Sequence, residues 1–571
     1  MNVLSGRPRA VVGKGASASM PRVMGVLAAA LLAACGGSSS GDSGVEDVVA
    51  FSLDRDTVDC KASPEGDCAT VTVYATPTHM ERKDRTPLLI ARSVDGAPGI
   101  PVAIASTGTQ LPDGRWQMQV KLSPDRPAGV YVGAIHVDMP LDVVAPAGKR
   151  YRGARLSYRL EVNAVTLSSA PLPAVVAGAS SWSEAPGGPT RSGYVPVTLD
   201  AGKFSRRWMT WVVGGTDLTA PGTPALVDGQ ILLPQARPFG ATAGTNALAL
   251  SELDGKPQWT ATLNGTAVTQ VTAAGGNAVW AAQQTTPSQY MAYATSRSNG
   301  AVIAGKMLSD INAPRFWLAT DDALYVSDRN KGSLEAINLA DFQTRWTATV
   351  QPSPGGLLPV VMQYGPTVAD GVVYTHAGTT FRAFRASDGA QLLDTIADGG
   401  QTLSLKLYES QTPVIADATT VLAMDRPRYV SDEAGVNAGI QAMSRVDGSV
   451  RWTVRQPFRG LPVTAKGMFY VANQGSKTIE ARQVADGALV WSWPMETGDK
   501  AWQPTMVLTD SHLIVSTDRQ TVAIDLASRQ AVWRYPLGGW LGMTQRGTLV
   551  VVTMNSGSTN GPTALSAFDM R

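Results

Sequence analysis

The chain has 571 residues, including 57 glycines and 36 prolines, and carries a formal charge of +2. This length exceeds what one ordinary hydrophobic core supports, and the glycine and proline content without a long amphipathic helical pattern favours a mostly β protein with more than one domain. We do not expect this protein to bind nucleic acid. Such proteins concentrate positive charge to release phosphate counterions, and no basic run occurs here.

The first segment has the pattern of a secretory signal. Arg22 is followed by an apolar run over residues 23–34, which is too short to span a bilayer. The run ends in Leu-Ala-Ala-Cys at Cys35. This ending resembles the bacterial lipobox, whose cysteine is acylated and becomes the new N-terminus. The alternative is an ordinary signal peptide with a chance cysteine.

The resemblance predicts a lipoprotein signal peptide over residues 1–35, with lipid attached at Cys35 and translation starting at Met1 or Met20. Glycine rather than aspartate follows the cysteine, which in lipoprotein sorting implies the outer membrane. The four basic residues before Cys35 would then be removed, leaving 44 basic and 46 acidic residues. We therefore expect a nearly neutral mature protein that is anchored in the outer membrane by lipid and faces the periplasm.

Residues 36–45 are rich in glycine and serine and predict a flexible tether. Residues 46–165 then show about seven short alternating runs separated by turn-rich pieces, which suits a β-sandwich. The runs Ala-Gly-Val-Tyr-Val-Gly at 128–133 and Tyr-Arg-Leu-Glu-Val at 158–162 resemble bacterial immunoglobulin-like modules. Residues 166–193, rich in Ser, Ala, Pro and Gly, predict an interdomain linker.

Cys60 and Cys68 are the other cysteines of the chain. In an oxidising periplasm we expect them to form a small-loop disulfide. A metal site is the alternative, but two cysteines without a nearby histidine or third thiol do not complete the four-ligand shell of zinc.

From residue 194 to residue 571 the sequence repeats. In residues 521–536, apolar residues alternate along one strand and Trp533 lies on a second, which predicts a β-hairpin. An alanine and a tryptophan ten positions apart mark this hairpin and four relatives: Ala249/Trp259, Ala336/Trp346, Ala442/Trp452, Ala481/Trp491 and Ala523/Trp533. Two degenerate copies pair Ala383 with Leu393 and Ala294 with Ala304.

An eighth copy is split between the two ends of this region. Residues 564–571 supply its first strand, and residues 195–211, centred on Trp208, can supply the missing outer strand. A companion hairpin precedes each repeat, as at residues 366–374 and 462–470. Two hairpins per repeat make the four strands of a propeller blade. The predicted fold class is therefore all-β, with an N-terminal sandwich followed by an eight-bladed propeller closed by pairing of N- and C-terminal strands.

The repeat Ala-x-(Asp/Asn)-x-x-x-Gly-x-x-x-Trp resembles the tryptophan-docking repeat of quinoprotein and PQQ-like propellers, over residues 194–571. Within that family, a lipidated eight-bladed member is most similar to the propeller lipoproteins of the outer-membrane β-barrel assembly machinery. The added sandwich domain departs from that pattern. Because fold alone does not specify chemistry, function must be inferred from individual sites.

The repeated tryptophans could form a stacking platform, but one large aromatic at the same place in each blade is better explained as packing between blades. We expect this structural role for Trp208, Trp259, Trp346, Trp452, Trp491 and Trp533.

The family also contains PQQ-dependent dehydrogenases, which hold PQQ over the axis with a Ca²⁺ and a general base. The alcohol-dehydrogenase branch carries a disulfide between adjacent cysteines, and no cysteine follows Cys68. The glucose-dehydrogenase type uses a histidine base, for which His376 and His512 are the propeller candidates. Both are expected at strand ends or on the surface. We expect no catalytic residue, cofactor or metal; a periplasmic PQQ-dependent dehydrogenase is the alternative, and a carbohydrate or cell-wall binding module is a second.

Tight Asp-Gly and Asn-Gly turns should gather on one face of the propeller, so the long insertions belong to the other face. Insertions confined to one face commonly mark a binding face. Variable surface loops are the alternative. The insertions carry residue types enriched at protein interfaces: Met362, Tyr364, Tyr408, Arg426, Arg428, Tyr429 and Trp502. The sequence therefore predicts a non-enzymatic scaffold that binds an envelope protein partner, with outer-membrane protein assembly as the most specific version.

Overall fold

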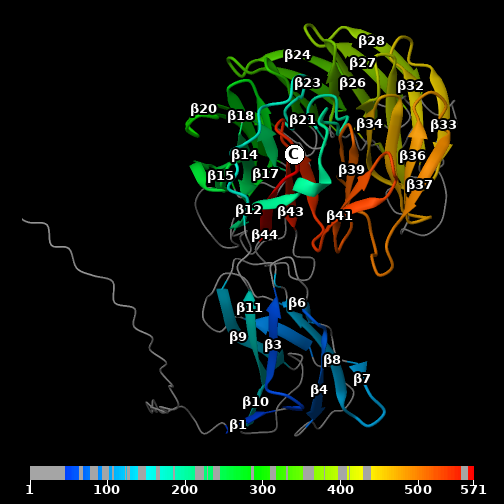
Figure 1. The fold of residues 1–571 in the computed structure, drawn as a ribbon. Coiled ribbons are helices and arrows are strands. Elements are labelled where there is room, and N and C mark those ends of the chain that lie inside the picture. Colours follow the sequence, from blue (N-terminus) through cyan, green and yellow to red (C-terminus); the bar gives the residue numbers. More distant parts are fainter. Residues whose placement is uncertain are drawn as a thin grey trace, which may run out of the picture.

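The computed structural model contains an N-terminal β-sandwich and a C-terminal β-propeller (Figure 1). It describes residues 46–49, 51–62, 68–77, 88–92, 102–105, 109–122, 124, 129–138, 149–162, 167–183, 187–212, 224–227, 229–235, 245–265, 267–284, 289–308, 317–328, 332–350, 365–377, 380–396, 408–410, 412–427, 439–553 and 563–571. Cys35 and the predicted tether lie outside these residues.

Two sheets form the sandwich. One contains β3 (Thr57–Ala62), β11 (Ala154–Val162), β9 (Gly129–Asp138) and β5 (Leu88–Arg92) in that order. The other contains β2 (Phe51–Leu53), β4 (Val71–Pro77), β8 (Trp116–Leu122) and β6 (Val102–Ala105), with β7 (Thr109–Gln110) also paired to β8. Strands β1 (Glu46–Val49) and β10 (Lys149–Arg152) form a separate pair.

Alternation explains how the two sheets pack. Buried and accessible residues alternate along β8 and along β11, so one face of each strand enters the core. The shared core contains Trp116, Met118 and Val120 of one sheet and Leu156 and Leu160 of the other. The predicted sandwich is confirmed, whereas its immunoglobulin-like character stays a prediction.

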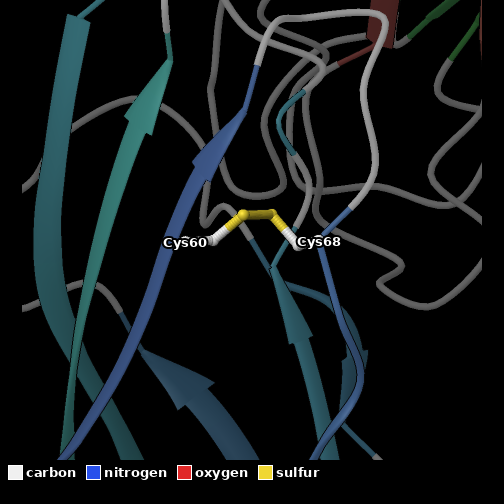
Figure 2. The surroundings of a disulfide bond; sticks show 2 residues. All are labelled: Cys60 and Cys68. Carbon is white, nitrogen blue, oxygen red and sulfur yellow. A yellow bond between two sulfur atoms is a disulfide. The ribbon is translucent and has the colours of Figure 1, made fainter.

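The predicted disulfide is present. Cys60 lies in β3 and Cys68 precedes β4, so the bond joins the two sheets of the sandwich (Figure 2). Their Cα atoms are 5.8 Å apart. A cross-link of this kind stabilises a small domain mainly by restricting its unfolded chain.

The propeller has eight four-stranded blades, numbered here in chain order, which confirms the predicted count. Blade 1 contains β13 (Ala225–Val227), β14 (Gln230–Gln235), β15 (Thr245–Ser251) and β16 (Pro257–Leu263). Blade 2 contains β17 (Ala267–Ala274), β18 (Asn277–Gln283), β19 (Tyr290–Ser296) and β20 (Val302–Leu308). Blade 3 contains β21 (Trp317–Ala319), β22 (Ala323–Asp328), β23 (Ser333–Asn338) and β24 (Thr344–Thr349). Blade 4 contains β25 (Thr367–Ala369), β26 (Val372–Ala377), β27 (Thr380–Arg385) and β28 (Gln391–Ile396).

The innermost strand of blade 5 is interrupted, with β29 (Tyr408–Ser410) and β30 (Val414–Ile415) both pairing with β31 (Thr420–Pro427), followed by β32 (Gly439–Ser444) and β33 (Val450–Arg455). Blade 6 contains β34 (Phe458–Ala465), β35 (Met468–Asn473), β36 (Thr478–Gln483) and β37 (Leu489–Pro494). Blade 7 contains β38 (Val507–Leu508), β39 (His512–Ser516), β40 (Thr521–Asp525) and β41 (Ala531–Tyr535).

Blade 8 closes the ring from the two ends of the propeller sequence. Its strands β42 (Trp540–Met543), β43 (Thr548–Thr553) and β44 (Thr563–Asp569) precede the C-terminus, and β12 (Ser205–Val212) supplies the outermost strand. Strand β12 pairs antiparallel with β44, and Trp208 lies opposite Ala567. The predicted closure by N- and C-terminal strands is therefore confirmed.

Antiparallel order gives the propeller two different faces. Turns between the first and second strands and between the third and fourth strands of a blade lie on one face, which we call the turn face; Gly229 and Gly255 are examples. Connections between second and third strands, and between blades, lie on the opposite loop face. The strand ends that flank residues 351–364, 397–407 and 428–438 are at the loop face, as expected from the sequence.

Candidate functional site

The repeated tryptophans dock each blade onto the next. Trp259 of blade 1 donates its indole N–H to the carbonyl of Arg297 in blade 2, at 2.7 Å, and its ring lies against Gly300. The same contact recurs three more times: Trp208 with Glu252 and Gly255, Trp346 with Ala386 and Gly389, and Trp452 with Val484 and Gly487. In each repeat the carbonyl lies three positions after the repeated alanine, and the glycine lies six positions after it. These side chains fill junctions and form no open stacking platform.

Two junctions use other residues at the glycine position. Blade 2 carries Ala304 where most other blades have tryptophan. Phe342 of blade 3 stands where its neighbours have glycine, and it belongs to the core cluster against which Ala304 packs. At the next variant junction, the guanidinium of Arg529 lies over the Trp491 ring, 6.0 Å from its centroid. Phe342 and Arg529 both have φ near +58°, the left-handed conformation that the turn requires.

The stretch predicted as a linker instead enters the propeller. Residues 176–183 and 187–197, here together called the axial segment, run along the innermost strands of the ring and bond to them through main-chain groups (Figure 1). Trp182 forms an antiparallel bridge with Leu226 of blade 1, and Tyr194 forms a parallel bridge with Leu508 of blade 7. Within the axial segment, Trp182, Arg191, Val195 and Val197 are all at most 3% exposed. The linker prediction is therefore wrong for this part of residues 166–193.

Composition explains that error. A glycine-, serine- and proline-rich stretch is typical of flexible linkers, but here it satisfies the exposed edges of innermost strands, which need only backbone partners. The signal that could have found it is apolar: Trp182 within the stretch, and the alternation of Val195, Val197 and Leu199 directly after it.

Both ends of the axial segment contact the turn face. Val176 donates its N–H to the carbonyl of Gln545, and Asp510 donates its N–H to the carbonyl of Val197; both partners lie in turns between first and second strands. Arg191 reaches toward the opposite end of the ring. Its guanidinium donates to the carbonyls of Trp317 and Pro366, which lie at or just before the first residues of innermost strands.

A polar latch holds the second half of the axial segment. The Tyr194 hydroxyl donates to Asp510 at 2.5 Å, and Lys466 of blade 6 forms an ion pair with the same carboxylate at 2.6 Å. Hydrogen bonds from Lys466 and then Tyr194 lower the pKa of Asp510. Burial, and then the bond to Asp510, raises the pKa of Tyr194. The latch thus joins the axial segment to blades 6 and 7.

A buried ion pair locks the seam of the ring. Arg207 of β12 forms two hydrogen bonds to Asp569 of β44, at 2.6 and 3.0 Å, and its side chain is 2% exposed. The Ser168 hydroxyl donates to the same carboxylate, and Arg207 also donates to the carbonyl of Ala170. The residues that precede the axial segment and the outermost strand of blade 8 are therefore both held by hydrogen bonds around Asp569 and Arg207.

The structure describes only part of the predicted partner-binding set. Met362, Tyr364, Arg428 and Tyr429 lie outside the described residues. The backbones of Tyr408 and Arg426 lie in the paired strands β29 and β31, at the loop-face end of blade 5.

Trp502 is a correction to that set. Its side chain is 1% exposed and its ring packs against Trp493, so it belongs to the core between blades 6 and 7. A side chain buried in this way does not present its ring to a partner.

The two propeller histidines, expected at strand ends or on the surface, lie at or next to the end of a strand, but both are buried, so the surface alternative is wrong. His376 lies within β26 and His512 begins β39, and both are at most 4% exposed. Burial lowers the pKa of His512, whose Nδ1 is 2.8 Å from the Ser511 hydroxyl. The imidazole ring of His512 also packs against the phenyl ring of Phe204.

Within the described ranges, no group of three or more His, Cys, Asp or Glu side chains is placed to hold a metal ion. Among those same residues, no helix is long and apolar enough to cross a membrane.

Comparison with known proteins gives a family match over about the last two thirds of the propeller sequence. The family model described as outer membrane protein assembly factor BamB matches residues 330–570, from blade 3 to the end of β44. A search of curated proteins finds no match.

Solved structures show likenesses at low identity. The crystal structure of BamB from Moraxella catarrhalis is 14% identical, with a TM-score of 0.43, covering 64% of this chain and 98% of that one. The computationally designed Ika8 protein is 10% identical, with a TM-score of 0.44, covering 61% of this chain and 96% of that one. KlHsv2 with loop 6CD replaced by a Gly-Ser linker is 11% identical, with a TM-score of 0.32, covering 49% and 86%.

The family match and the repeated alanine–tryptophan register agree with each other. Every full repeat places its alanine opposite its tryptophan, with an irregularity in the pairing immediately after the alanine. The C-terminal part of the chain is therefore a propeller of PQQ-like repeats, similar to the outer membrane protein assembly factor BamB.

Proposed function

We propose that this protein is a non-enzymatic, lipid-anchored scaffold of the outer membrane, whose propeller binds an envelope protein in the periplasm through its loop face. The observation that carries the proposal is the axial segment. A PQQ-dependent dehydrogenase needs the axis for its cofactor, whereas this chain places its own residues along the innermost strands.

Side-chain chemistry at the axis supports the same choice. Arg191 is 3% exposed and uses its guanidinium to bond carbonyls of two innermost strands. His376 and His512, the candidate bases, are held in strands of blades 4 and 7. All three side chains are at most 4% exposed, which favours a packing role for them.

The loop face is the better docking surface for a partner. The two ends of the axial segment, Ser168 and the start of β12 all lie at the turn face. The chain thus approaches the propeller from the turn face, and the loop face is left opposite to it. Long insertions begin and end at that opposite face, where binding residues of repeat proteins commonly occur.

Outer-membrane protein assembly is the most specific version of the proposal. It is supported by the family match over residues 330–570 and by the lipobox-like sequence ending at Cys35. The sandwich adds a second unit between the predicted anchor and the propeller, so it can act as a spacer or as a further contact.

The test is capture of partners from crosslinked cell envelopes, with the native chain and with Arg426→Glu/Arg428→Glu. We expect the native chain to recover an envelope protein and the variant to recover much less of it. Arg385→Glu is the matched control, because Arg385 is an exposed arginine at a turn-face hairpin of blade 4. Equal recovery with both variants would exclude this face as the docking surface.

Two further measurements separate the alternatives. Adding PQQ and Ca²⁺ to the purified protein should leave its absorbance unchanged and give no dye reduction with alcohols or sugars; reduction would establish the dehydrogenase instead. Cys35→Ser should release the protein from the membrane fraction, and a variant that stays membrane-bound would contradict lipid anchoring.

A further inference from the structure

The axial segment contacts every blade of the ring. Its carbonyls accept main-chain hydrogen bonds of 2.8 to 3.1 Å from the innermost strands of six blades. The pairs are Trp182 with Leu226, Ser183 with Ala273, Pro189 with Val368, Thr190 with Ile415, Ser192 with Thr464 and Gly193 with Leu508. The side chain of Arg191 reaches the carbonyl of Trp317 in blade 3. Val176 donates to Gln545 in blade 8. No blade-to-blade junction has this range, because each junction joins two neighbours.

Repeat architectures ordinarily couple only neighbouring units, so a ring of blades can loosen locally at its weakest junction. One such junction is the seam of blade 8, where β12 and β44 come from distant parts of the sequence. A single segment bonded to all eight blades changes this. If one innermost strand detaches, the axial segment shifts, and its bonds to the other blades are weakened as well.

We propose that the axial segment is a clasp built into the fold, which couples non-neighbouring blades so that the ring opens as one unit. The clasp acts through backbone bonds of residues 182–183 and 189–193 and through the latch from Tyr194 to Asp510. It is independent of the proposed partner, since it concerns how the ring holds together and leaves the loop face free.

Close packing near Gly193 shows where the clasp is tightest. Gly193 has φ +62°, and a Cβ atom placed there would lie 2.3 Å from a methyl carbon of Val463 and 3.6 Å from the carbonyl oxygen of Met506. Gly187 lies against the backbone of Gly193, so the segment folds back on itself inside the ring. A side chain at position 193 therefore forces Val463 and the segment apart, which loosens the segment's packing against blade 6.

Gly178 provides a matched control in the same segment. Its φ is +77°, so alanine there meets the same backbone strain as alanine at position 193. A Cβ atom at Gly178 would meet nothing within 4 Å. Gly178→Ala and Gly193→Ala therefore introduce similar backbone strain, but only Gly193→Ala is expected to displace the segment.

The experiment is native-state hydrogen exchange of the full-length protein, resolved to peptides and followed by mass spectrometry. In Gly193→Ala we expect exchange to accelerate by about tenfold or more at the nearby amides of Thr464 and Leu508. The clasp predicts similar acceleration at Leu226 and Ala273, which belong to blades 1 and 2 on the far arm of the segment. Gly178→Ala should leave all four unchanged.

Acceleration confined to blades 6 and 7 would overturn the proposal, because it would show a local packing defect without coupling. Tyr194→Phe gives a second route if Gly193→Ala fails to fold, since it removes only the hydroxyl bonded to Asp510. In Tyr194→Phe we expect hydrogen exchange to accelerate in blades 1, 2, 6 and 7, as in Gly193→Ala, but by a smaller factor. Acceleration limited to blades 6 and 7, or to blade 7 alone, would again contradict the clasp.

Discussion

The junction between blades 1 and 2 and the junction between blades 2 and 3 solve one packing problem in opposite ways. At the first, Trp259 extends from blade 1 and Gly300 of blade 2 leaves room for its ring. At the second, blade 2 offers only Ala304, and blade 3 supplies the bulk through Phe342. The large side chain has moved from one partner to the other.

This difference shows that the volume of the junction is constrained more tightly than either residue. Interiors are close-packed, so a void at one side must be filled from the other. The turn conformation is constrained as well, because Gly300, Phe342 and Arg529 all have positive φ. Glycine at this position is therefore favoured by its backbone freedom, but phenylalanine and arginine also occupy it, and Arg529 does so opposite Trp491.

The seam of blade 8 differs from both junctions because its paired strands, β12 and β44, are far apart in the sequence and no short loop connects them. We expect Asp569→Asn to destabilise the protein by about 3–5 kcal/mol, because it leaves the buried charge of Arg207 without its partner. Chemical denaturation measures the change. Asp388→Asn is the control, since both Asp388 and its partner Arg385 are exposed and such surface pairs contribute little to stability. Similar losses for both variants would show that the seam is no stronger than a surface pair.

The reversed junction can be tested by exchanging its residues. Phe342→Gly should destabilise by about 2–4 kcal/mol, because the lost aromatic burial exceeds the relief of a positive-φ backbone. Ala304→Trp alone should also destabilise, by overpacking against Phe342.

The combined variant Ala304→Trp/Phe342→Gly should recover most of the loss, since it rebuilds the arrangement of Trp259 and Gly300. A double-mutant cycle from denaturation midpoints gives the coupling. Additive losses would mean that the two positions do not share one volume.

At an ordinary junction, Gly389→Ala should cost more than Gly371→Ala. Both positions have φ near +72°, so both variants incur about 1–2 kcal/mol of backbone strain. A Cβ atom at Gly389 would lie 2.6 Å from the Trp346 ring, whereas one at Gly371 meets nothing within 4 Å. We expect an additional loss of about 1–3 kcal/mol for Gly389→Ala from the displaced ring, measured by thermal unfolding. Equal unfolding midpoints for Gly389→Ala and Gly371→Ala would show that the Trp346 ring does not pack closely against position 389.

The smallest effect is expected where arginine replaces the glycine. Arg529→Gly removes a cation–π contact with Trp491 but relieves a left-handed backbone. These terms are each about 1 kcal/mol and oppose one another, so the net change in unfolding free energy should stay within about 1 kcal/mol. A large loss would assign Arg529 a structural role comparable to Phe342.

The sequence predicted the propeller closely because its repeats carry side-chain signals. The ten-residue offset of alanine and tryptophan is the strand register itself, as the pairing of Ala523 with Trp533 shows. Phe342 could have been found in the same way, since it lies six positions after Ala336, where related repeats have glycine.

The axial segment was missed because most of its bonds are main-chain bonds, which many residue types can make, and because its Gly-, Ser- and Pro-rich composition is typical of a linker. Trp502 was misplaced for a related reason: its aromatic ring suits an interface as well as a core, and only the packing of Trp493 against it decides between them. Local composition therefore identifies repeating units well and identifies single inserted segments poorly.

The bond between Ser168 and Asp569 has a consequence for the order of folding. These residues are 401 positions apart, and the axial segment that follows Ser168 needs acceptors and donors from blades that are synthesised much later. Contacts so distant in sequence make folding slow, because loop-closure entropy must be overcome before they form. The segment that emerges before the first blade is thus among the last to reach its place, and the ring is completed only when the whole chain is present.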